Sequence, residues 1–368
     1  MKQILGALAL ALPMVPALAQ SSVTIYGVLD LSVGATNNGN GNVKQLMSGV
    51  GPGSRLGFRG TEDLGGGLKA NFVLEEGIAV DTGTLNQGGL AWGRQIFVGL
   101  SSTWWSLSAG RQYSPLNVSL VESDAFRQVY WGDTTGTGNA LYQSPGAAQG
   151  SGGQASTARV NNSVLATATG GGFTGRLMVA AGDEGNNGSG HLAMLGGTYR
   201  VGGLLLTGTY NRFRQYATTL AAGTSPQWQT EFNVGGSYDF GPVMLLAGYY
   251  SYDPSENRTP GAPTALDPRF TKTVSDWIGF RAPLGGGTLI GQVMKTTFDY
   301  AAADGRGTTI AAAYEYPLSK RTTLYGSYAQ LNNNAQGLVS IQGATVSVFP
   351  AYPGADLRGY AFGLRHTF

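Results

Sequence analysis

The connections between the extended runs of this chain alternate between short and long, from near the N-terminus to the final phenylalanine. Seven of them are short and turn-like: 63–67, 101–103, 170–172, 201–203, 240–242, 283–287 and 317–320. Long polar stretches lie between them, such as 36–53, 113–156, 254–270 and 332–356. Short turns at one end and long loops at the other end are the layout of an antiparallel β-barrel that crosses a membrane.

The runs that join a turn to a long stretch alternate apolar and polar residues with a period of two. In the first run, Val23, Ile25 and Leu29 share one face. Thr24 and Asp30 fall on the other face. A continuous helix would instead group apolar residues three and four positions apart. Residues 92–100 carry apolar side chains at both parities, so the pattern assigns them no orientation.

The seven turns and eight long connections predict about sixteen strands, with both termini on the turn side. A closed barrel suits lipid because each unsatisfied backbone group of an open edge costs several kcal/mol there. A barrel of about sixteen strands is too wide for side chains to fill, so water enters it. The predicted fold is therefore an all-β transmembrane barrel. A secreted sandwich, β-helix or passenger domain would require neither alternating connections nor one uniform strand length.

The N-terminus and the composition agree with export. Lys2, the apolar run 4–12, and the small residues Ala17 and Ala19 predict a signal peptide over 1–19 and a single mature domain over 20–368. Charged residues make up only 12%, whereas a soluble domain carries about 25%. There are no cysteines and the formal net charge is +2. These values exclude a disulfide framework and argue against nucleic-acid binding.

Catalysis is not expected. The chain has two histidines, His191 and His366, which the strand order places on opposite sides of the membrane. No nucleophile elbow, zinc-protease motif or phosphate loop occurs in the sequence. No cofactor is indicated, although loop acids such as Asp253 and Glu256 leave calcium binding open.

Several segments together resemble the general porins of Gram-negative, particularly β-proteobacterial, outer membranes. They are 22–27, 54–70, 93–100, 110–113, 159–164, 318–322 and 363–368. The resemblance implies a homotrimer of sixteen-stranded barrels that lets ions and small hydrophilic solutes diffuse through water-filled channels. It also implies a third long loop, 113–156, folded into the lumen. Its implied partners are outer-membrane lipid, lipopolysaccharide and the barrel-assembly machinery, for which Phe368 would be the signal.

The same resemblance implies a charged constriction between the wall and the third loop. The basic wall residues expected there by motif are Arg55, Arg94 and Arg159, with Arg59 and Lys69 added by inward parity. The acids expected on the loop are Glu122, Asp124 and Asp133. Basic side chains in a pore favour anions, so we expect a weak anion preference. Which acids face the lumen stays open, as does the alternative of a substrate-selective channel or an adhesin or receptor barrel.

Overall fold

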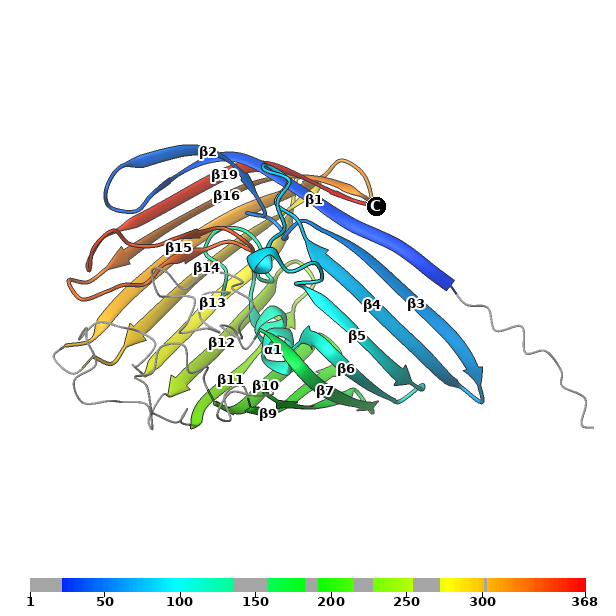
Figure 1. Ribbon diagram of the computed structural model, residues 1–368. Coiled ribbons are helices and arrows are strands. Elements are labelled where there is room, and N and C mark those ends of the chain that lie inside the picture. The colour runs from blue at the N-terminus through cyan, green and yellow to red at the C-terminus, as the bar shows by residue number, and fades with distance from the viewer. Residues whose placement is uncertain (1–21, 135–157, 183–190, 215–227, 254–271, 301–302) are drawn as a thin grey trace, which may run out of the picture.

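The computed structural model describes residues 22–134, 158–182, 191–214, 228–253, 272–300 and 303–368. The predicted signal peptide, 1–19, and residues 135–157 of the third long loop lie outside the described residues. Nearly all described strands belong to one antiparallel sheet of 17 strands, which closes because β1 pairs with β19 on one side and with β2 and β3 on the other. Figure 1 shows the resulting barrel.

The elements follow one another along the chain with neighbours paired in space. They are β1 (Ser22–Asn37), β2 (Asn42–Ser48), β3 (Arg55–Gly65), β4 (Leu68–Gly77), η1 (Gln87–Gly89), β5 (Gln95–Ser101), β6 (Trp105–Tyr113), α1 (Pro115–Ser123), β7 (Arg159–Gly170), β8 (Phe173–Ala181), β9 (His191–Val201), β10 (Leu204–Arg214), β11 (Trp228–Asp239), β12 (Met244–Asp253), β13 (Thr273–Leu284), β14 (Gly287–Phe298), β15 (Gly305–Pro317), β16 (Thr322–Asn333), β17 (Ile341–Gln342), β18 (Ser347–Val348) and β19 (Leu357–Thr367).

The second strand of the barrel is split in two. β3 pairs with the first half of β1, from Ser22 to Val28, and β2 pairs with the second half, from Leu31 to Asn37. Counted as one, they give the closed barrel 16 strands, which confirms the predicted number. The predicted connection 36–53 is therefore shorter than expected. Residues 42–48 of this connection form β2, which pairs with the C-terminal half of β1. Residues 49–54 then turn into the interior of the barrel.

The period-two pattern separates lipid-facing from interior side chains. On β1, Val23 and Ile25 are 64% and 60% exposed, whereas Asp30 is fully buried on the inner side. β5, which the pattern left without an orientation, places Val98 outward at 65% exposure. The alternation on that strand was unclear because Phe97 is an apolar residue that faces the interior. An apolar side chain at an inward-facing position therefore hides the alternation of apolar and polar residues.

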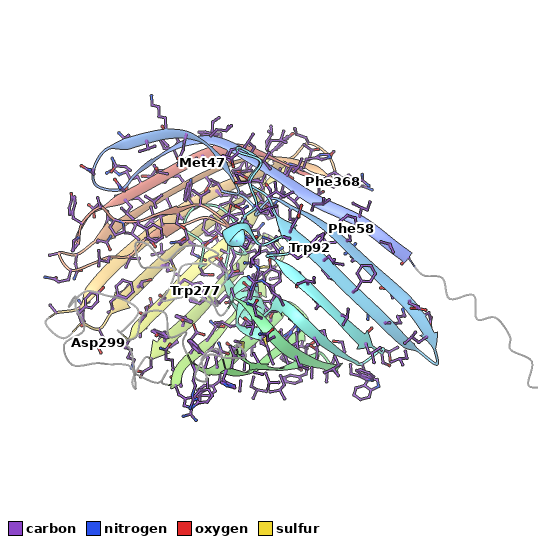
Figure 2. All side chains as sticks on the ribbon, in the orientation of Figure 1. Met47, Phe58, Trp92, Trp277, Asp299 and Phe368 are labelled. Carbon is purple, nitrogen blue, oxygen red and sulfur yellow. The ribbon has the colours of Figure 1, made fainter. Side chains whose placement is uncertain are left out.

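The interior of the barrel holds the α1 helix, which the sequence did not reveal (Figure 1). Ser114 caps its first turn by accepting a hydrogen bond from the backbone N–H of Asn117, and Pro115 occupies the first turn, where its missing N–H costs nothing. Trp277 of β13 donates its indole N–H to the carbonyl oxygen of Ser123 at 2.8 Å, and its position can be followed in Figure 2. None of the described helices is long and apolar enough to cross a membrane.

The segment after α1 is anchored to the wall by aromatic side chains. Phe126, Tyr130 and Trp131 are fully buried. They share one apolar cluster with wall residues of β14, β15, β16 and β19: Ile290, Ala311, Ala313, Ala329, Leu331, Leu357 and Ala361. Wall glycines make room for the loop, since a Cβ on Gly279 would lie 2.6 Å from the Cβ of Ala125.

The last long connection also enters the barrel, which was not expected from the sequence. Its small hairpin, β17–β18, reaches the third loop, where the N–H of Gly132 donates to the carbonyl oxygen of Gln342 at 2.8 Å. Thr345 donates its N–H to Gly49 at 3.0 Å. Three separate connections therefore narrow the lumen together.

The final residue completes the sheet. The N–H of Phe368 donates to the carbonyl oxygen of Gly27, and the N–H of Gly27 donates to the carbonyl oxygen of Phe368, both at 3.2 Å. Figure 2 shows the Phe368 side chain at the edge of the barrel beside β1.

Candidate functional site

The three arginines expected on the wall by motif meet around one tyrosine and one glutamate. Arg94 donates from Nε to Glu75 Oε1 at 2.7 Å and from Nη2 to the Tyr113 hydroxyl at 2.6 Å. Arg159 donates from Nη2 to the same hydroxyl at 2.8 Å. Arg55 Nε lies 3.7 Å from Glu75 Oε2.

Strand register brings these side chains to one height. Arg55 pairs with Val28, near the middle of the 16-residue β1. Glu75 pairs with Gln95, the neighbour of Arg94, and Tyr113 pairs with Arg159. The cluster therefore lies about midway through the barrel, where the wall strands face the inward loop.

A polar cavity of about 330 Å³ separates this wall cluster from the loop. On the loop side it is lined by Asn117 and Val121 of α1, by Arg127, Gln128 and Val129, and, from the other inward segments, by Gly53 and Ala344. The charged residues among its lining are four arginines and one glutamate, which are Arg55, Arg94, Arg127, Arg159 and Glu75. Guanidinium groups stay protonated in proteins, so the cavity carries a net positive charge.

The remaining basic candidates lie elsewhere. The Arg59 guanidinium is exposed and sits 5.1 Å from the centre of the Tyr26 ring. Lys69 is exposed near the short turns. Neither residue lines the cavity. The structure thus brings together the three arginines identified by motif and leaves apart the two that were added by parity.

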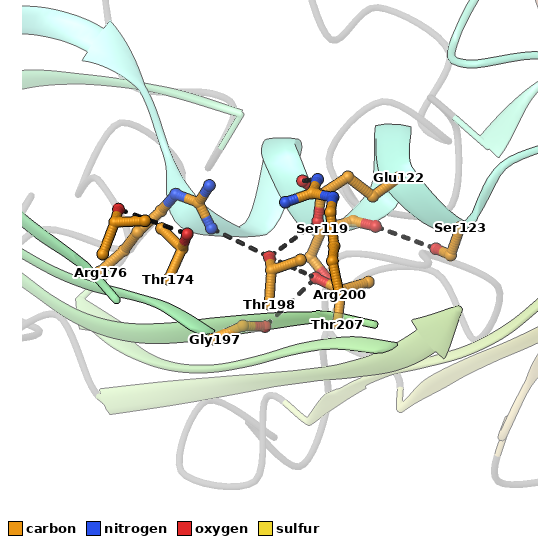
Figure 3. Close-up of polar contacts among 10 residues, drawn as sticks. Ser119, Glu122, Ser123, Thr174, Arg176, Gly197, Thr198, Arg200 and Thr207 are labelled. Atoms are coloured by element: carbon orange, nitrogen blue, oxygen red, sulfur yellow. Dashed lines mark hydrogen bonds and ion pairs between the residues drawn. The ribbon is translucent and has the colours of Figure 1, made fainter. Parts of the chain in front are cut away.

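Glu122, the first predicted loop acid, points to a different part of the wall. Its carboxylate forms an ion pair with Arg200 of β9 and accepts a hydrogen bond from the Thr198 hydroxyl at 2.8 Å. Arg176 donates to the same hydroxyl at 3.0 Å. Figure 3 shows this network between α1 and the wall strands. Glu122 therefore helps to hold α1 in place and is absent from the cavity lining.

The other two loop acids are fully buried. The Asp124 carboxylate accepts hydrogen bonds from the N–H groups of Phe126, Gln128 and Thr134 and from the Thr134 hydroxyl. Burial raises the pKa of Asp124, and the N–H groups that it binds act in the opposite direction. Asp133 has no exposed surface either. Neither acid lines the cavity. Among the described residues, no carboxylate of the third loop therefore faces the wall arginines across the cavity.

Three residues of this site were not identified from the sequence. Glu75 carries the inward parity of β4, which was a usable signal, and Tyr113 ends the strand that precedes the third loop. Arg127 had no such signal, because it lies in irregular chain after α1 where no period applies. Among the described residues, no group of three or more metal-ligating side chains lies close enough to hold a metal ion.

Comparisons with known proteins agree with this architecture. A family model described as Gram-negative porin matches residues 6–336. The chain is 31% identical to outer membrane porin protein 32 of Delftia acidovorans, with 100% of both chains covered. It is 28% identical to an outer membrane porin protein of Bordetella pertussis, with 85% of this chain and 90% of that one covered.

Among solved structures, the anion-selective porin from Comamonas acidovorans superposes with a TM-score of 0.78 at 27% identity, over 95% of this chain and 100% of that one. The barrel, the inward loop and the full-length matches lead to one assignment. The chain belongs to the Gram-negative porin family, and it forms a channel through the bacterial outer membrane.

Proposed function

We propose that this porin passes small hydrophilic solutes and ions by passive diffusion with a preference for anions. The observation that carries the proposal is the charge of the cavity lining, with four arginines and a single glutamate. The related Comamonas porin is described as anion-selective, which supports the same sign here.

The physical basis is the short distance that a narrow lumen imposes between an ion and the basic side chains. A unit charge about 5 Å away changes the energy of a monovalent ion by about 0.8 kcal/mol in water. Glu75 offsets part of the charge of Arg94 and Arg55, because its carboxylate oxygens lie 2.7 Å from Arg94 Nε and 3.7 Å from Arg55 Nε. Arg159 and Arg127 have no carboxylate within ion-pair distance among the described residues. These two groups therefore lack the direct carboxylate partner that Arg94 and Arg55 have in Glu75.

The test is the reversal potential of the refolded mature chain in a planar bilayer under a tenfold salt gradient. We expect the anion sign, and we expect Arg159→Gln to shift the potential toward cations. Arg306→Gln is the matched control, because Arg306 is exposed and pairs with Asp304 at 2.7 Å, away from the cavity. A cation sign in the unsubstituted protein would overturn the anion preference, and a sealed membrane would overturn diffusion itself.

The assembly and processing of the chain are further proposals. We propose a homotrimer embedded in outer-membrane lipid and lipopolysaccharide, with the short turns and both termini facing the periplasm. The pairing of Phe368 with Gly27 supports a role for the terminal strand in barrel closure and in recognition by the assembly machinery. We propose that residues 1–19 are cleaved and that the protein catalyses no reaction. Native mass measurement of the purified protein tests the trimer, and N-terminal sequencing tests the cleavage.

A further inference from the structure

The segment that follows α1 has two chemically different sides. Phe126, Tyr130 and Trp131 are fully buried against the wall. Arg127, between them in sequence, is exposed and lines the cavity that also contains the wall arginines. Among the described residues, no hydrogen bond or ion pair engages the Arg127 guanidinium. The loop therefore presents a cation to the lumen where an acid was expected.

The backbone that presents Arg127 is in an unfavourable conformation. Arg127, Gln128 and Tyr130 have positive φ angles of 56°, 58° and 71°, and none of them is glycine. Each such residue costs about 1–2 kcal/mol. Conformations of this kind persist only where the surroundings determine them, and they concentrate at functional sites.

Asp124 supplies the determining contacts. Its carboxylate accepts the N–H of Phe126 at 3.0 Å and the N–H of Gln128 at 2.8 Å, on either side of Arg127. The carbonyl oxygen of Asp124 accepts the N–H of Arg127 at 3.0 Å. The Asp124 carboxylate also accepts the backbone N–H of Thr134 at 3.2 Å, and this bond joins the two ends of the segment 124–134. Three successive N–H groups thus converge on one residue, and the Arg127 side chain is left to point away from it.

No acid elsewhere on the loop counters this charge. Glu122 pairs with Arg200 at a separate place on the wall. Asp124 and Asp133 are fully buried. Residues 135–157 contain no charged residue in their sequence. Basic groups therefore line the cavity on both the wall side and the loop side. The loop side of the cavity offers no carboxylate that would attract cations.

We propose that Arg127 is a specificity-determining residue of this pore and that Asp124 is the positioning residue that holds it in the lumen. This inference rests on the proposed anion preference and adds the loop side to its origin. Neutralising Arg127 lowers the anion-to-cation permeability ratio by about two- to fivefold, because it removes one unit charge about 5 Å from the ion path.

The experiment compares reversal potentials of the unsubstituted porin, Arg127→Gln, Arg127→Lys and the control Arg306→Gln. We expect Arg127→Gln to lose anion preference, and we expect Arg127→Lys and Arg306→Gln to keep it. If the unsubstituted porin is anion-selective and Arg127→Gln matches it, the inference is wrong while the proposed function stands. If the unsubstituted porin has no anion preference, the proposed function fails first, and the inference fails with it.

A double-mutant cycle tests the positioning role of Asp124. We expect Asp124→Asn to lower the anion preference in the unsubstituted background and to change nothing further in the Arg127→Gln background. An equal effect of Asp124→Asn in both backgrounds would show that it acts on selectivity by another route. If Asp124→Asn yields no folded barrel, Arg127→Gln alone still decides the role of Arg127, and Asp124 is then a folding residue and the positioning role is rejected.

Discussion

Replacing Glu75 with glutamine removes the single negative charge from the cavity lining and leaves its four arginines in place. Glu75 is 5% exposed and receives hydrogen bonds from Arg94 at 2.7 Å and from the Tyr26 hydroxyl at 3.0 Å. A glutamine has the same shape and keeps one acceptor oxygen. The substitution therefore changes the charge of the cavity far more than its form.

The expected size of the effect follows from Coulomb's law. The Coulomb energy between the carboxylate and a monovalent ion about 5 Å away is about 0.8 kcal/mol in water. Screening at about 0.1 M salt, with a Debye length of about 10 Å, reduces this to about 0.5 kcal/mol. That energy enriches a monovalent anion about 2.3-fold and depletes a cation equally. We therefore expect Glu75→Gln to raise the anion-to-cation permeability ratio about fivefold.

The assay is the reversal potential in a planar bilayer at about 0.1 M mean salt, with folding checked by circular dichroism. Glu76→Gln is a matched control, since Glu76 is the next residue on β4 and has the opposite, outward parity. Arg94 loses its ionic partner in the Glu75 variant, and loss of one partner of a buried ion pair costs about 3–5 kcal/mol of stability. An unchanged ratio, or a shift toward cations, in a folded Glu75→Gln porin would refute the electrostatic reasoning.

Two further substitutions test how the constriction is built. Tyr113→Phe removes the shared acceptor of Arg94 and Arg159; we expect a loss of about 2 kcal/mol in unfolding free energy, measured in detergent, with the anion preference retained because both charges remain. A large loss of selectivity in that variant would show that guanidinium placement matters more than charge number. Gly279→Val would place a Cβ 2.6 Å from that of Ala125; we expect the loop to be pushed into the lumen and single-channel conductance to fall. Conductance equal to that of the unsubstituted porin would contradict the close packing of loop and wall.

The barrel could be predicted because lipid and water impose a regular demand on every strand. Outward positions such as Val23 and Ile25 must be apolar, and the closed sheet leaves no backbone edge unpaired. The same parity puts Arg55 on the inner face, and the strand register then brings it to Glu75. Loop conformation obeys no such period. It depends on contacts between distant segments, such as Tyr130, whose N–H donates to Val50 at 2.7 Å.

The predicted loop acids show why the conformation of the inward loop could not be predicted from the sequence. Sequence alone shows that Glu122, Asp124 and Asp133 lie on a loop expected to enter the lumen. It does not show whether a carboxylate will face water or accept hydrogen bonds from its own backbone. Aspartate readily binds N–H groups a few residues ahead of it, and Asp124 binds those of Phe126 and Gln128. The charged side chain of this segment that faces the cavity is then Arg127.

The net charge of the lumen follows from how acids are used elsewhere inside the barrel. Glu315 accepts a hydrogen bond from the Tyr130 hydroxyl at 2.7 Å and pairs with Arg281 at 2.9 Å, and so ties the inward loop to the wall. Asp30 accepts the N–H of Gly51 at 3.1 Å, which holds the first inward segment. Both carboxylates are engaged by contacts that hold inward segments, and neither of them lines the cavity. A barrel that fastens its loops with carboxylates therefore leaves its arginines to set the field that a passing ion meets.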